Sequence, residues 1–545
     1  MLEWPDATLY EGLRAVADRT PDATALHFRG GRTTYAELLA DSEALARGLA
    51  ALGVGADDRV AVWLGNRPEW VTAQLAAAHL GAVVVAVNTR YRTHELEYML
   101  EDSGCSVLLT EESFLGNDYL GMLADVVPEV RDQPPEEFDP DSVPSLTAVV
   151  GLSTHPEFPA VRGYDAVLDR GAEPAGNTGP EPATDPEAPV TVFYTSGTTS
   201  DPKGCLQSSR SVLNHSYNVG SHLGLGSEDV ALGVLPFCGV WGYNTMLSAL
   251  SRGLPLVVQT HFEPERTLDL IETHGVTYCN AQAVMFDRMR RAEHFDTERV
   301  GTLRRGVTAF LTMGVDGAVF EDLEAAFGLP LVQPYGISEG NSMVFVGDPE
   351  DPLEQRKRVG GPPIHPDAAV RVVDPETGTE VPPGEEGELC LRGYNVMNSY
   401  HDKPEQTAAA VDDEGWLHTG DLGVRDEAGY CYYRSRLDDA LRVRGFLVTP
   451  RDIETALNGQ PGVDQAQVVG AAHPRHGQVP VAFVIRDDES LDAATLQDSL
   501  AGEVADYKCP ADIEFVEAFP RTEGPHGAKV RKGELRERVA DRYKG

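Results

Sequence analysis

The sequence predicts an α/β protein in which helices flank parallel sheets. Helix-like and strand-like segments alternate over residues 7–128, and the alternation resumes from Val190 to about residue 340. This alternation is typical of parallel strands joined by crossover helices. From there to about residue 434 the chain consists of short strands separated by Gly and Pro, which indicates an additional β part. The length of 545 residues corresponds to about three or four domain-sized units.

The first elements can be placed in order along the chain. Apolar spacing predicts helices at residues 9–19, 35–52 and 68–80, and short apolar runs predict strands at 59–64, 82–86 and 106–109. Thr34 can cap the second helix, and Glu37 three residues later completes a capping box. The acidic, proline-rich residues 129–190 are expected to cross the surface with a few short strands, without forming a domain boundary.

The charge of the chain excludes several partners. There are 86 acidic and 45 basic residues, a net charge of −41 at pH 7. Such a charge argues against nucleic acid or an anionic membrane surface as a partner. Only seven of the basic residues are lysine, and the acidic residues are spread along the chain. This pattern predicts a halophilic protein whose surface repulsion is screened by salt. A merely acidic protein from a low-salt cell is the alternative.

The cysteines and the apolar segments indicate the cellular compartment in which the protein is expected. The seven cysteines include no C-x-x-C pair, so neither a disulfide framework nor a zinc site is suggested, and a reducing cytoplasm is expected. Trp4, Pro5 and Asp6 stand where a signal peptide needs basic residues and then an apolar run. The most apolar stretch, residues 75–87, is too short to span a bilayer. We therefore expect a cytoplasmic protein without an integral membrane segment.

The densest chemical signal lies at residues 194–204, which read Y-T-S-G-T-T-S-D-P-K-G and follow an apolar strand at 190–193. Small hydroxyl residues with Gly expose backbone N–H groups and O–H donors, and Lys203 adds a point charge suited to phosphate. The loop does not match the spacing of a Walker A motif, G-x-x-x-x-G-K-[ST]. A flexible Ser/Thr loop is the alternative. The phosphate-binding candidates are Thr195, Ser196, Gly197, Thr198, Thr199 and Lys203.

Further motifs follow in a fixed order: Q-P-Y-G-I-S-E at 333–339, W-L-H-T-G-D at 416–421, S-R-L-D-D at 435–439, R-V-R-G-F at 442–446, P-R-D-I-E at 450–454, and P-R-T at 520–522 with K-V-R-K at 529–532. With the loop, they resemble the adenylate-forming superfamily of acyl-CoA synthetases, standalone adenylation domains and luciferases over essentially the whole chain. Ser200 departs from the family's usual Gly in the loop. The resemblance implies a large N-terminal AMP-binding domain, residues 1–437, of helix-flanked sheets with a β-barrel-like part. A small mobile α+β lid, residues 438–545, would follow.

The resemblance also implies roles for single residues. The Tyr335 ring would pack on adenine beside Gln333, Gly336 and the small-residue turn that contains Gly314. Ser338 would reach the α-phosphate, and Glu339 would hold Mg²⁺ that bridges phosphate oxygens. Asp421 and Arg436 would bind the ribose. The expected catalytic residues are Lys529, Glu339, Lys203 and Thr195.

The C-terminal motifs imply a domain rotation. By the resemblance Asp438 is the hinge, and Arg444 and Gly445 lie at the CoA pantetheine tunnel. Lys529 would contact the substrate carboxylate and the α-phosphate, although three residues are inserted within 523–528 and Ala528 replaces the usual Gly. Residues 521–545 hold eight basic and four acidic side chains. That positive segment suggests an anionic ligand, with a basic amphipathic helix at 532–543 as the alternative.

The expected function is that of an ATP-dependent acyl-CoA ligase. It would activate a carboxylic acid as an acyl adenylate, release pyrophosphate, and pass the acyl group to CoA with release of AMP. ATP, Mg²⁺ and CoA are the implied cofactors and substrates, and a homodimer is implied at the level of the family. Acyl-pocket walls are expected at 237–246, 278–286 and 311–316, with Trp241 filling volume where Gly239 replaces a frequent His. A standalone adenylation enzyme that loads a carrier protein, and a nucleotide-binding protein without turnover, are the alternatives.

Overall fold

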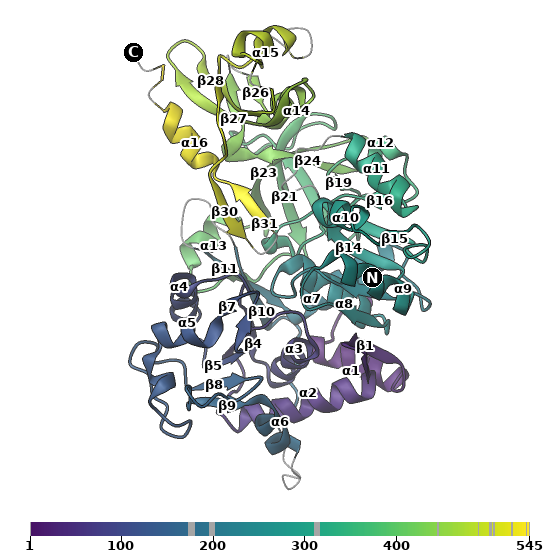
Figure 1. Ribbon diagram of the computed structural model, residues 1–545, viewed down its shortest axis with the longest axis vertical. Helices are drawn as coiled ribbons and strands as arrows, with labels where there is room; N and C mark the ends of the chain where they lie inside the picture. The colour runs from purple at the N-terminus through teal and green to yellow at the C-terminus, as the bar shows by residue number, and fades with distance from the viewer. Residues whose placement is uncertain are drawn as a thin grey trace.

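The structure is a computed structural model, shown in Figure 1. It describes residues 2–172, 180–195, 202–309, 317–443, 446–488, 490–500, 504, 507–524, 527–540 and 542–543. The molecule is elongated, with the N-terminal elements at one end and the C-terminal elements at the other. No described helix has both the length and the apolar character needed to cross a membrane.

An eight-stranded sheet forms the centre of the N-terminal part, with strand order β22-β11-β10-β4-β3-β5-β8-β9. The strands from β10 to β9 are parallel, whereas β11 and β22 are antiparallel to their neighbours. Their bounds are β3 (Arg59–Trp63), β4 (Val83–Ala86), β5 (Val107–Thr110), β8 (Ala148–Gly151), β9 (Val161–Gly163), β10 (Pro189–Tyr194), β11 (Gly204–Ser208) and β22 (Ser399–Tyr400). The predicted surface crossing over residues 129–190 therefore contributes two strands to this sheet.

A second sheet of seven strands has the order β16-β15-β14-β12-β13-β1-β2 and is parallel except for its edge strand β2. Its strands are β1 (Thr24–Phe28), β2 (Gly31–Thr34), β12 (Ala231–Gly233), β13 (Leu256–Val258), β14 (Tyr278–Gln282), β15 (Arg305–Ala309) and β16 (Leu331–Val332). One core cluster contains residues of both sheets together with α3 (Pro68–Leu80) and α8 (Val240–Leu250). All eleven residues of α8 are buried, because both of its faces are covered by other elements.

The remaining helices of the N-terminal part are α1 (Leu9–Arg19), α2 (Tyr35–Ala50), α4 (Thr93–Ser103), α5 (Tyr119–Val126), α6 (Tyr164–Ala172), α7 (Ser209–His222), α9 (Pro264–His274), α10 (Ala283–Arg290), α11 (Gly317–Phe327), α12 (Leu353–Arg356) and α13 (Pro404–Ala410). The first three predicted helices are confirmed, and α2 ends two residues earlier than predicted. The capping box of Thr34 and Glu37 is present. Helix α6 lies where only strands were predicted.

The β part after residue 340 is a five-stranded antiparallel sheet of order β19-β24-β23-β21-β20. It consists of β19 (Gly360–Gly361), β20 (Ala368–Val373), β21 (Glu386–Gly393), β23 (Leu417–Arg425) and β24 (Cys431–Arg436), with the small pair β17 (Pro334–Tyr335) and β18 (Phe345–Val346) nearby. Together they form the curled half-barrel that the sequence suggested. Two short strands, β6 (Ser113–Phe114) and β7 (Asn117–Asp118), form a separate hairpin.

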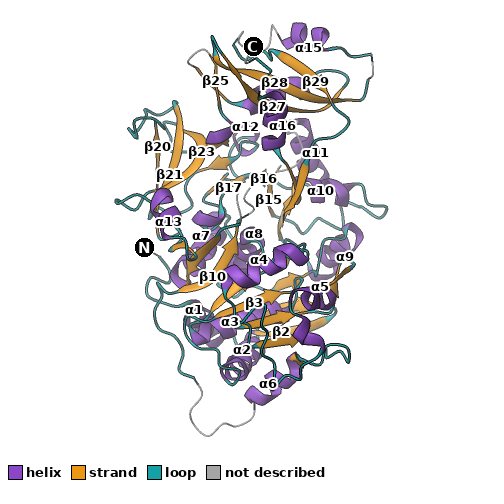
Figure 2. Cartoon of the chain, turned by 90° about the vertical axis from the view of Figure 1, so that its left-hand side faces the viewer, coloured by secondary structure: helices purple, strands orange, loops and turns teal. Residues whose placement is uncertain are grey.

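The C-terminal unit is a small α+β layer at one end of the molecule (Figure 2). Its sheet contains β25 (Leu441–Val443), β26 (Phe446–Val448), β27 (Val463–His473), β28 (Gly477–Arg486) and β29 (Asp512–Phe515). The helices are α14 (Pro450–Asn458), α15 (Ala493–Leu500) and α16 (Lys532–Val539). The hairpin of β30 (Arg521–Gly524) and β31 (Gly527–Val530) extends from this unit toward the large domain in the view of Figure 1.

Candidate active site

The predicted phosphate loop connects β10 to β11, and two of its residues close its base. The backbone N–H of Thr195 donates to the carbonyl of Lys203 at 2.9 Å, and the N–H of Lys203 donates to Oγ1 of Thr195 at 3.3 Å. The strands on either side are antiparallel neighbours, so the loop reverses the chain. Ser196, Gly197, Thr198 and Thr199 lie outside the described residues.

Two residues of α4 that the sequence analysis did not single out, Asp102 and Tyr98, hold the two ends of this loop. Asp102, at the end of α4, accepts from the Tyr194 hydroxyl at 2.8 Å and forms an ion pair with Lys403 at 2.7 Å. Tyr98 on the same helix donates to the carbonyl of Pro202 at 2.9 Å. The loop is thus anchored before and after the phosphate-binding residues. No sequence motif links these positions, because the contacts join segments about a hundred or more residues apart.

Tyr400 contacts both Lys203 and Glu339. The Lys203 ammonium lies 5.1 Å from the centre of the Tyr400 ring, and the Tyr400 hydroxyl donates to Oε1 of Glu339 at 2.8 Å. Lys203 forms no ion pair with any described residue, whereas Lys357, Lys403, Lys508 and Lys532 each pair with a carboxylate. Its positive charge therefore remains available to an anionic ligand.

Backbone contacts fix the position of the short 3-10 turn Ser338–Gly340 that carries Glu339. The side chain of Gln207 donates to the carbonyl of Ser338 at 2.7 Å, and the N–H of Met397 donates to the carbonyl of Glu339 at 2.8 Å. Gln207 lies on β11, directly after the phosphate loop. The predicted α-phosphate hydroxyl and the predicted metal ligand are therefore attached to the strand that leaves the loop.

The nucleoside end of the predicted site is built around Asp421 on β23. Its Oδ1 pairs with the Arg436 guanidinium at 2.9 Å, and its Oδ2 accepts from the Tyr335 hydroxyl at 2.7 Å. Asp421 and Arg436 are directly opposite on neighbouring antiparallel strands. Burial raises the pKa of the Asp421 carboxyl, although Arg436 and the Tyr335 hydroxyl oppose the rise. Each carboxylate oxygen can accept a second hydrogen bond, so both remain able to bind a ribose hydroxyl.

The turn that presents Asp421 is held by a buried carboxylate. Gly420 has φ +66, a conformation that favours glycine, and its N–H donates to Oε1 of Glu388 at 3.0 Å. The other oxygen of Glu388 pairs with His418 at 2.8 Å. The ligand atoms of Glu388, Cys390 and His418 lie within 4.8 Å of one another. Their contacts orient the turn, and burial raises the pKa of Cys390 to about 12, so its thiol stays protonated.

The Tyr335 ring is buried and packs against Phe345 and Tyr433, with ring centres 5.4 and 5.7 Å away. Gly336 lies against the following turn so closely that a Cβ there would be 2.2 Å from the N atom of Met343. Gln333 donates from Nε2 to the carbonyl of Lys357, and its buried Oε1 has no hydrogen-bond partner among the described residues. These residues form one surface beside Asp421. Gly314 lies outside the described residues.

Glu339 meets the requirement for a magnesium ligand. Mg²⁺ prefers oxygen ligands and is usually held by one or two carboxylates together with substrate phosphates. One Glu339 oxygen is oriented by Tyr400, and the second has no hydrogen-bond partner among the described residues. The residues present therefore fit one magnesium ion shared with a nucleotide.

The C-terminal candidates are only partly described. Asp438 lies in the 3-10 turn Leu437–Asp439 between β24 and β25, where the chain passes into the C-terminal unit. Lys529 lies on β31 opposite Thr522, and residues 525 and 526 of the segment that contains the insertion lie outside the described residues. The side chain of Lys529, and all of Arg444 and Gly445, lie outside the described residues.

Several described basic side chains of the C-terminal segment are paired with neighbouring carboxylates. Arg542 pairs with Asp512 and Glu514, Arg538 pairs with Glu514, and Lys532 pairs with Glu454. Arg536 on α16 pairs with Asp439, beside the predicted hinge. Helix α16 covers residues 532–539 of the predicted 532–543 and buries Leu535 and Val539, so the described part of the segment favours the alternative of a basic helix. The side chain of Lys529 and all of Lys544 lie outside the described residues.

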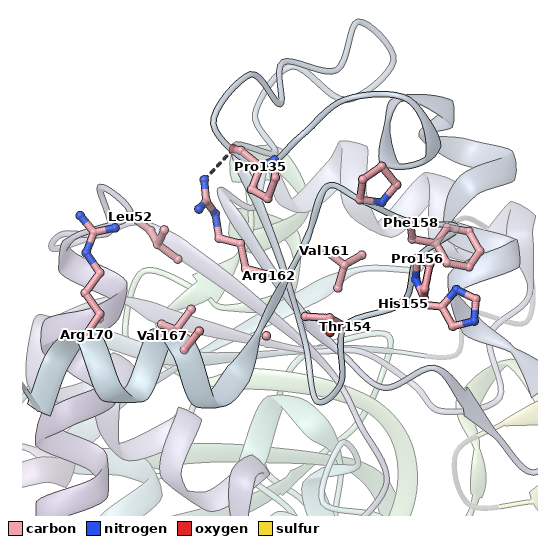
Figure 3. A pocket seen from close by; sticks show the side chains of 14 residues that line it. Leu52, Pro135, Thr154, His155, Pro156, Phe158, Val161, Arg162, Val167 and Arg170 are labelled. Carbon is pink, nitrogen blue, oxygen red and sulfur yellow. Dashed lines mark hydrogen bonds between the residues drawn. The ribbon is translucent and has the colours of Figure 1, made fainter.

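A cavity of about 610 Å³ lies away from these residues, between α2, β9 and α6 (Figure 3). Phe158, Val161 and Val167 line it together with Arg162 and Arg170, and it contains none of the predicted site residues. The predicted acyl-pocket residues instead lie at the start of α8. Gly239 caps that helix and Trp241 is buried in its first turn.

Comparison with known protein families gives two matches. The model described as "AMP-binding enzyme" matches residues 13–401, and the model described as "AMP-binding enzyme C-terminal domain" matches residues 452–524. The second match ends before Lys529, so it leaves the assignment of that lysine untested.

Known proteins match the chain over nearly its whole length. A CoA ligase of Mycobacterium tuberculosis that is named for a bicyclic dioxo-indenyl propanoate is 33% identical over 97% of this chain and 98% of its own. The mitochondrial medium-chain acyl-CoA ligase ACSF2 of Bos taurus is 30% identical over 99% of this chain and 88% of its own. The crystal structure of ATP-bound MatB from Rhodopseudomonas palustris superposes with a TM-score of 0.82 at 26% identity, and it covers 99% of this chain and 100% of that chain.

Proposed function

Because this chain belongs to the AMP-binding enzyme family and is an acyl-CoA ligase that acts through an adenylate, we propose that the two clusters described above form its single nucleotide site. Thr195 and Lys203 would bind the phosphates, and Glu339 would hold the magnesium ion. Asp421, Arg436 and Tyr335 would bind the nucleoside. The contact between Lys203, Tyr400 and Glu339 is the observation that carries this proposal. It combines a free ammonium and an oxygen ligand for a metal at the base of a phosphate loop.

The first half-reaction needs positive charge at the reacting centre. The substrate carboxylate attacks the α-phosphorus of ATP, the bond to the pyrophosphate oxygen breaks, and pyrophosphate leaves with the bonding electrons. Two anions approach each other in this step, so cations must lower the barrier. Bound Mg²⁺ would supply charge to the phosphates. Lys203 would neutralise the departing pyrophosphate, Lys529 the carboxylate and α-phosphate, and Ser338 would donate a hydrogen bond to the α-phosphate.

The second half-reaction needs a thiol at the same carbonyl carbon. The sulfur of CoA attacks the acyl carbonyl, and AMP leaves as the acyl–oxygen bond breaks. We place the boundary between domains 1–437 and 438–545 at Asp438, so that rotation of the lid removes Lys529 and brings Arg444 and Gly445 to the tunnel for the thiol. The position of Asp438 in the single connection between the two units supports this division.

CoA is the proposed acceptor because the relatives above are named as CoA ligases. Arg536, Arg538 and Arg542 of the basic C-terminal segment add no support to that choice, since each is paired with a carboxylate of the lid. A carrier-protein thiol remains the second candidate. Two relatives are named for a medium-chain acid and for a bicyclic propanoic acid, and these names support our proposal of an acid larger than acetate.

The test is AMP release by the purified protein with ATP and Mg²⁺. A panel of acids from acetate to palmitate, with aryl acids, is offered with either CoA or a holo carrier protein. The proposal expects acid-dependent AMP release that requires CoA. Release only with the carrier protein would favour the second candidate, and no pyrophosphate exchange with any acid would contradict an adenylating activity.

A further inference from the structure

The cavity between α2, β9 and α6 is separate from the proposed nucleotide site (Figure 3). Strand β9 ends the eight-stranded sheet, and the order β10-β4-β3-β5-β8-β9 puts five strand spacings between it and β10, which leads into the phosphate loop. Neighbouring strands lie about 4.8 Å apart, so β9 and β10 are roughly 24 Å from each other. A molecule confined to the cavity is therefore not the acid that reacts beside the phosphate loop.

Two helices and the segment before β9 form the walls of this cavity. Ala166, Val167 and Arg170 lie on one face of α6, because positions three and four apart share a helix face. Gly48 lets α2 approach that helix closely, since a Cβ at Gly48 would be 2.3 Å from the carbonyl oxygen of Val167. Residues 154–159 form a further wall. The packing of the two helix backbones thus fixes one side of the cavity.

The interior of the cavity is mainly apolar. Leu52, Phe158, Val161, Ala166 and Val167 line it together with three prolines. Its volume of about 610 Å³ falls within the range of about 300–1,000 Å³ that is typical of small-molecule sites. An alkyl chain that enters such a cavity is removed from water, which favours binding. The walls therefore suit a ligand with an apolar chain.

Two arginines give one side of the cavity a positive charge. Arg162 pairs with Glu136 at 3.3 Å and donates to the carbonyl of Pro135 at 2.6 Å. Arg170 is exposed and forms no ion pair or hydrogen bond with any residue that the structure describes. No described residue that lines the cavity carries a carboxylate. In Figure 3 both guanidinium groups lie on the same side of the cavity, and Phe158 lies on the other. In a chain of net charge −41, this arrangement indicates an anionic head group beside an apolar chain.

The charge at Arg170 selects a carboxylate as that head group. A guanidinium presents parallel N–H donors that match the two oxygens of a carboxylate. One carboxylate balances the one unpaired cation of the described lining. CoA or a nucleotide would bring several phosphate charges to a strongly acidic protein, with no further unpaired cation in that lining to receive them. An ammonium would meet two arginines and no carboxylate.

We propose that this cavity is a second ligand site, which binds a fatty carboxylate with its head group at Arg170 and its alkyl chain between Phe158, Val161 and Val167. The site goes beyond the proposed function, because none of the predicted active-site residues lines it. Binding there needs neither ATP nor Mg²⁺, since none of the proposed phosphate or metal ligands takes part. The chain thus holds a fatty acid at a place where it does not react.

The first test measures binding to the full-length protein without ATP or Mg²⁺. Equilibrium dialysis compares radiolabelled hexanoate, octanoate, decanoate and dodecanoate, each below its micellar concentration. Affinity is expected to rise by up to about fourfold for each added methylene until the cavity is full. Decanol, which has the same chain length as decanoate and no charge, is expected to bind at least about fivefold more weakly than decanoate. No binding of any acid, or equal binding of decanoate and decanol, would overturn the inference.

The second test locates the ligand. A photoreactive dodecanoate with a diazirine at its chain end is expected to label residues within 154–167, and excess decanoate should protect them. Labelling confined to other parts of the chain would overturn the inference. AMP release is measured separately, so this outcome would leave the proposed function standing.

Variants test the two halves of the site. Arg170→Glu reverses the charge and is expected to weaken decanoate at least about fivefold and to remove its advantage over decanol. Ala166→Trp fills the cavity from an exposed position on α6 and should abolish the labelling. The matched controls are Arg14→Glu on α1 and Ala494→Trp on α15, which change exposed residues outside the cavity. Melting temperatures check that all four variants are folded. Binding by Arg170→Glu and Ala166→Trp that equals binding by their controls would overturn the assignment.

Discussion

The hydroxyl of Tyr400 donates a 2.8 Å hydrogen bond to Glu339, a residue 61 positions earlier in the chain. The same Tyr400 ring lies 5.1 Å from the ammonium of Lys203. Tyr400 lies on β22, which pairs with β11 at the edge of the eight-stranded sheet. One edge strand thus places an aromatic ring between the end of the phosphate loop and the proposed metal ligand.

Tyr400→Phe tests this arrangement. The variant keeps the ring beside Lys203 but removes the hydrogen bond that orients the Glu339 carboxylate. Loss of a group that orients a metal ligand weakens metal binding by about tenfold or more. We expect the Mg²⁺ concentration for half-maximal adenylation to rise by that factor. Tyr430→Phe is the control, because that hydroxyl makes only a 3.4 Å contact with Asp351 outside the proposed nucleotide site. Equal Mg²⁺ dependence in the two variants would contradict the role of Tyr400.

The pH dependence of ATP binding should report Asp421. Burial raises its pKa above that of an ordinary aspartate, so the carboxylate is lost on acidification sooner than usual. The KM for ATP is therefore expected to rise as pH falls through that raised pKa. Arg436→Gln removes a positive charge that lowers the pKa, so the midpoint should move to higher pH. Arg434→Gln is the control, because Arg434 lies near Glu386. The titration of ATP itself affects the pH profiles of both variants equally, so the difference between their midpoints reports Asp421. An unmoved midpoint in Arg436→Gln would assign the transition to another group.

Lys529→Ala should abolish adenylate formation and leave thioester formation from supplied acyl-AMP largely intact. The lysine charge is needed only while pyrophosphate leaves, and the second half-reaction proceeds after the lid has rotated. Pyrophosphate exchange and thioester formation are measured separately. Lys357→Ala, which removes a surface lysine paired with Glu354, serves as the control. Adenylation at the wild-type rate in Lys529→Ala would show that the catalytic lysine is assigned wrongly.

Asp438→Pro should slow thioester formation more than adenylation. Proline fixes φ at the proposed hinge and so obstructs the rotation that only the second half-reaction requires. Asp438→Ala removes the same carboxylate and leaves the backbone free, so it should retain both rates. Equal losses in both half-reactions of the proline variant would point to misfolding and remove support for the hinge.

Salt should stabilise the enzyme. With a net charge of −41, surface carboxylates repel one another, and at ~0.01 M salt the Debye length grows to about 30 Å. Inactivation or unfolding is therefore expected at low ionic strength, with recovery in molar KCl. Melting temperature and AMP release from ~0.05 to ~3 M KCl measure the effect. A flat or falling profile would contradict the halophilic interpretation.

Short-range chemistry in the sequence determined the local structure and the kind of site. Thr34 and Glu37 of the capping box are three positions apart, so the start of α2 could be predicted from adjacent residues alone. The loop after β10 could be predicted to bind phosphate because its donors and its lysine are consecutive. The motifs that contain Tyr335, Glu339 and Asp421 were likewise visible, since each is contained in a few adjacent positions.

The tertiary structure decided which of these groups meet and which charges remain free. Asp102 anchors the phosphate loop to Lys403 across 301 residues, and no pattern along the chain records such a contact. The positive charges of Arg538 and Arg542 suggested an anionic ligand, but the fold places Glu514 between them. Whether a polar or charged group is paired depends on packing, because a hydrogen bond forms only where the fold brings a partner within about 3 Å.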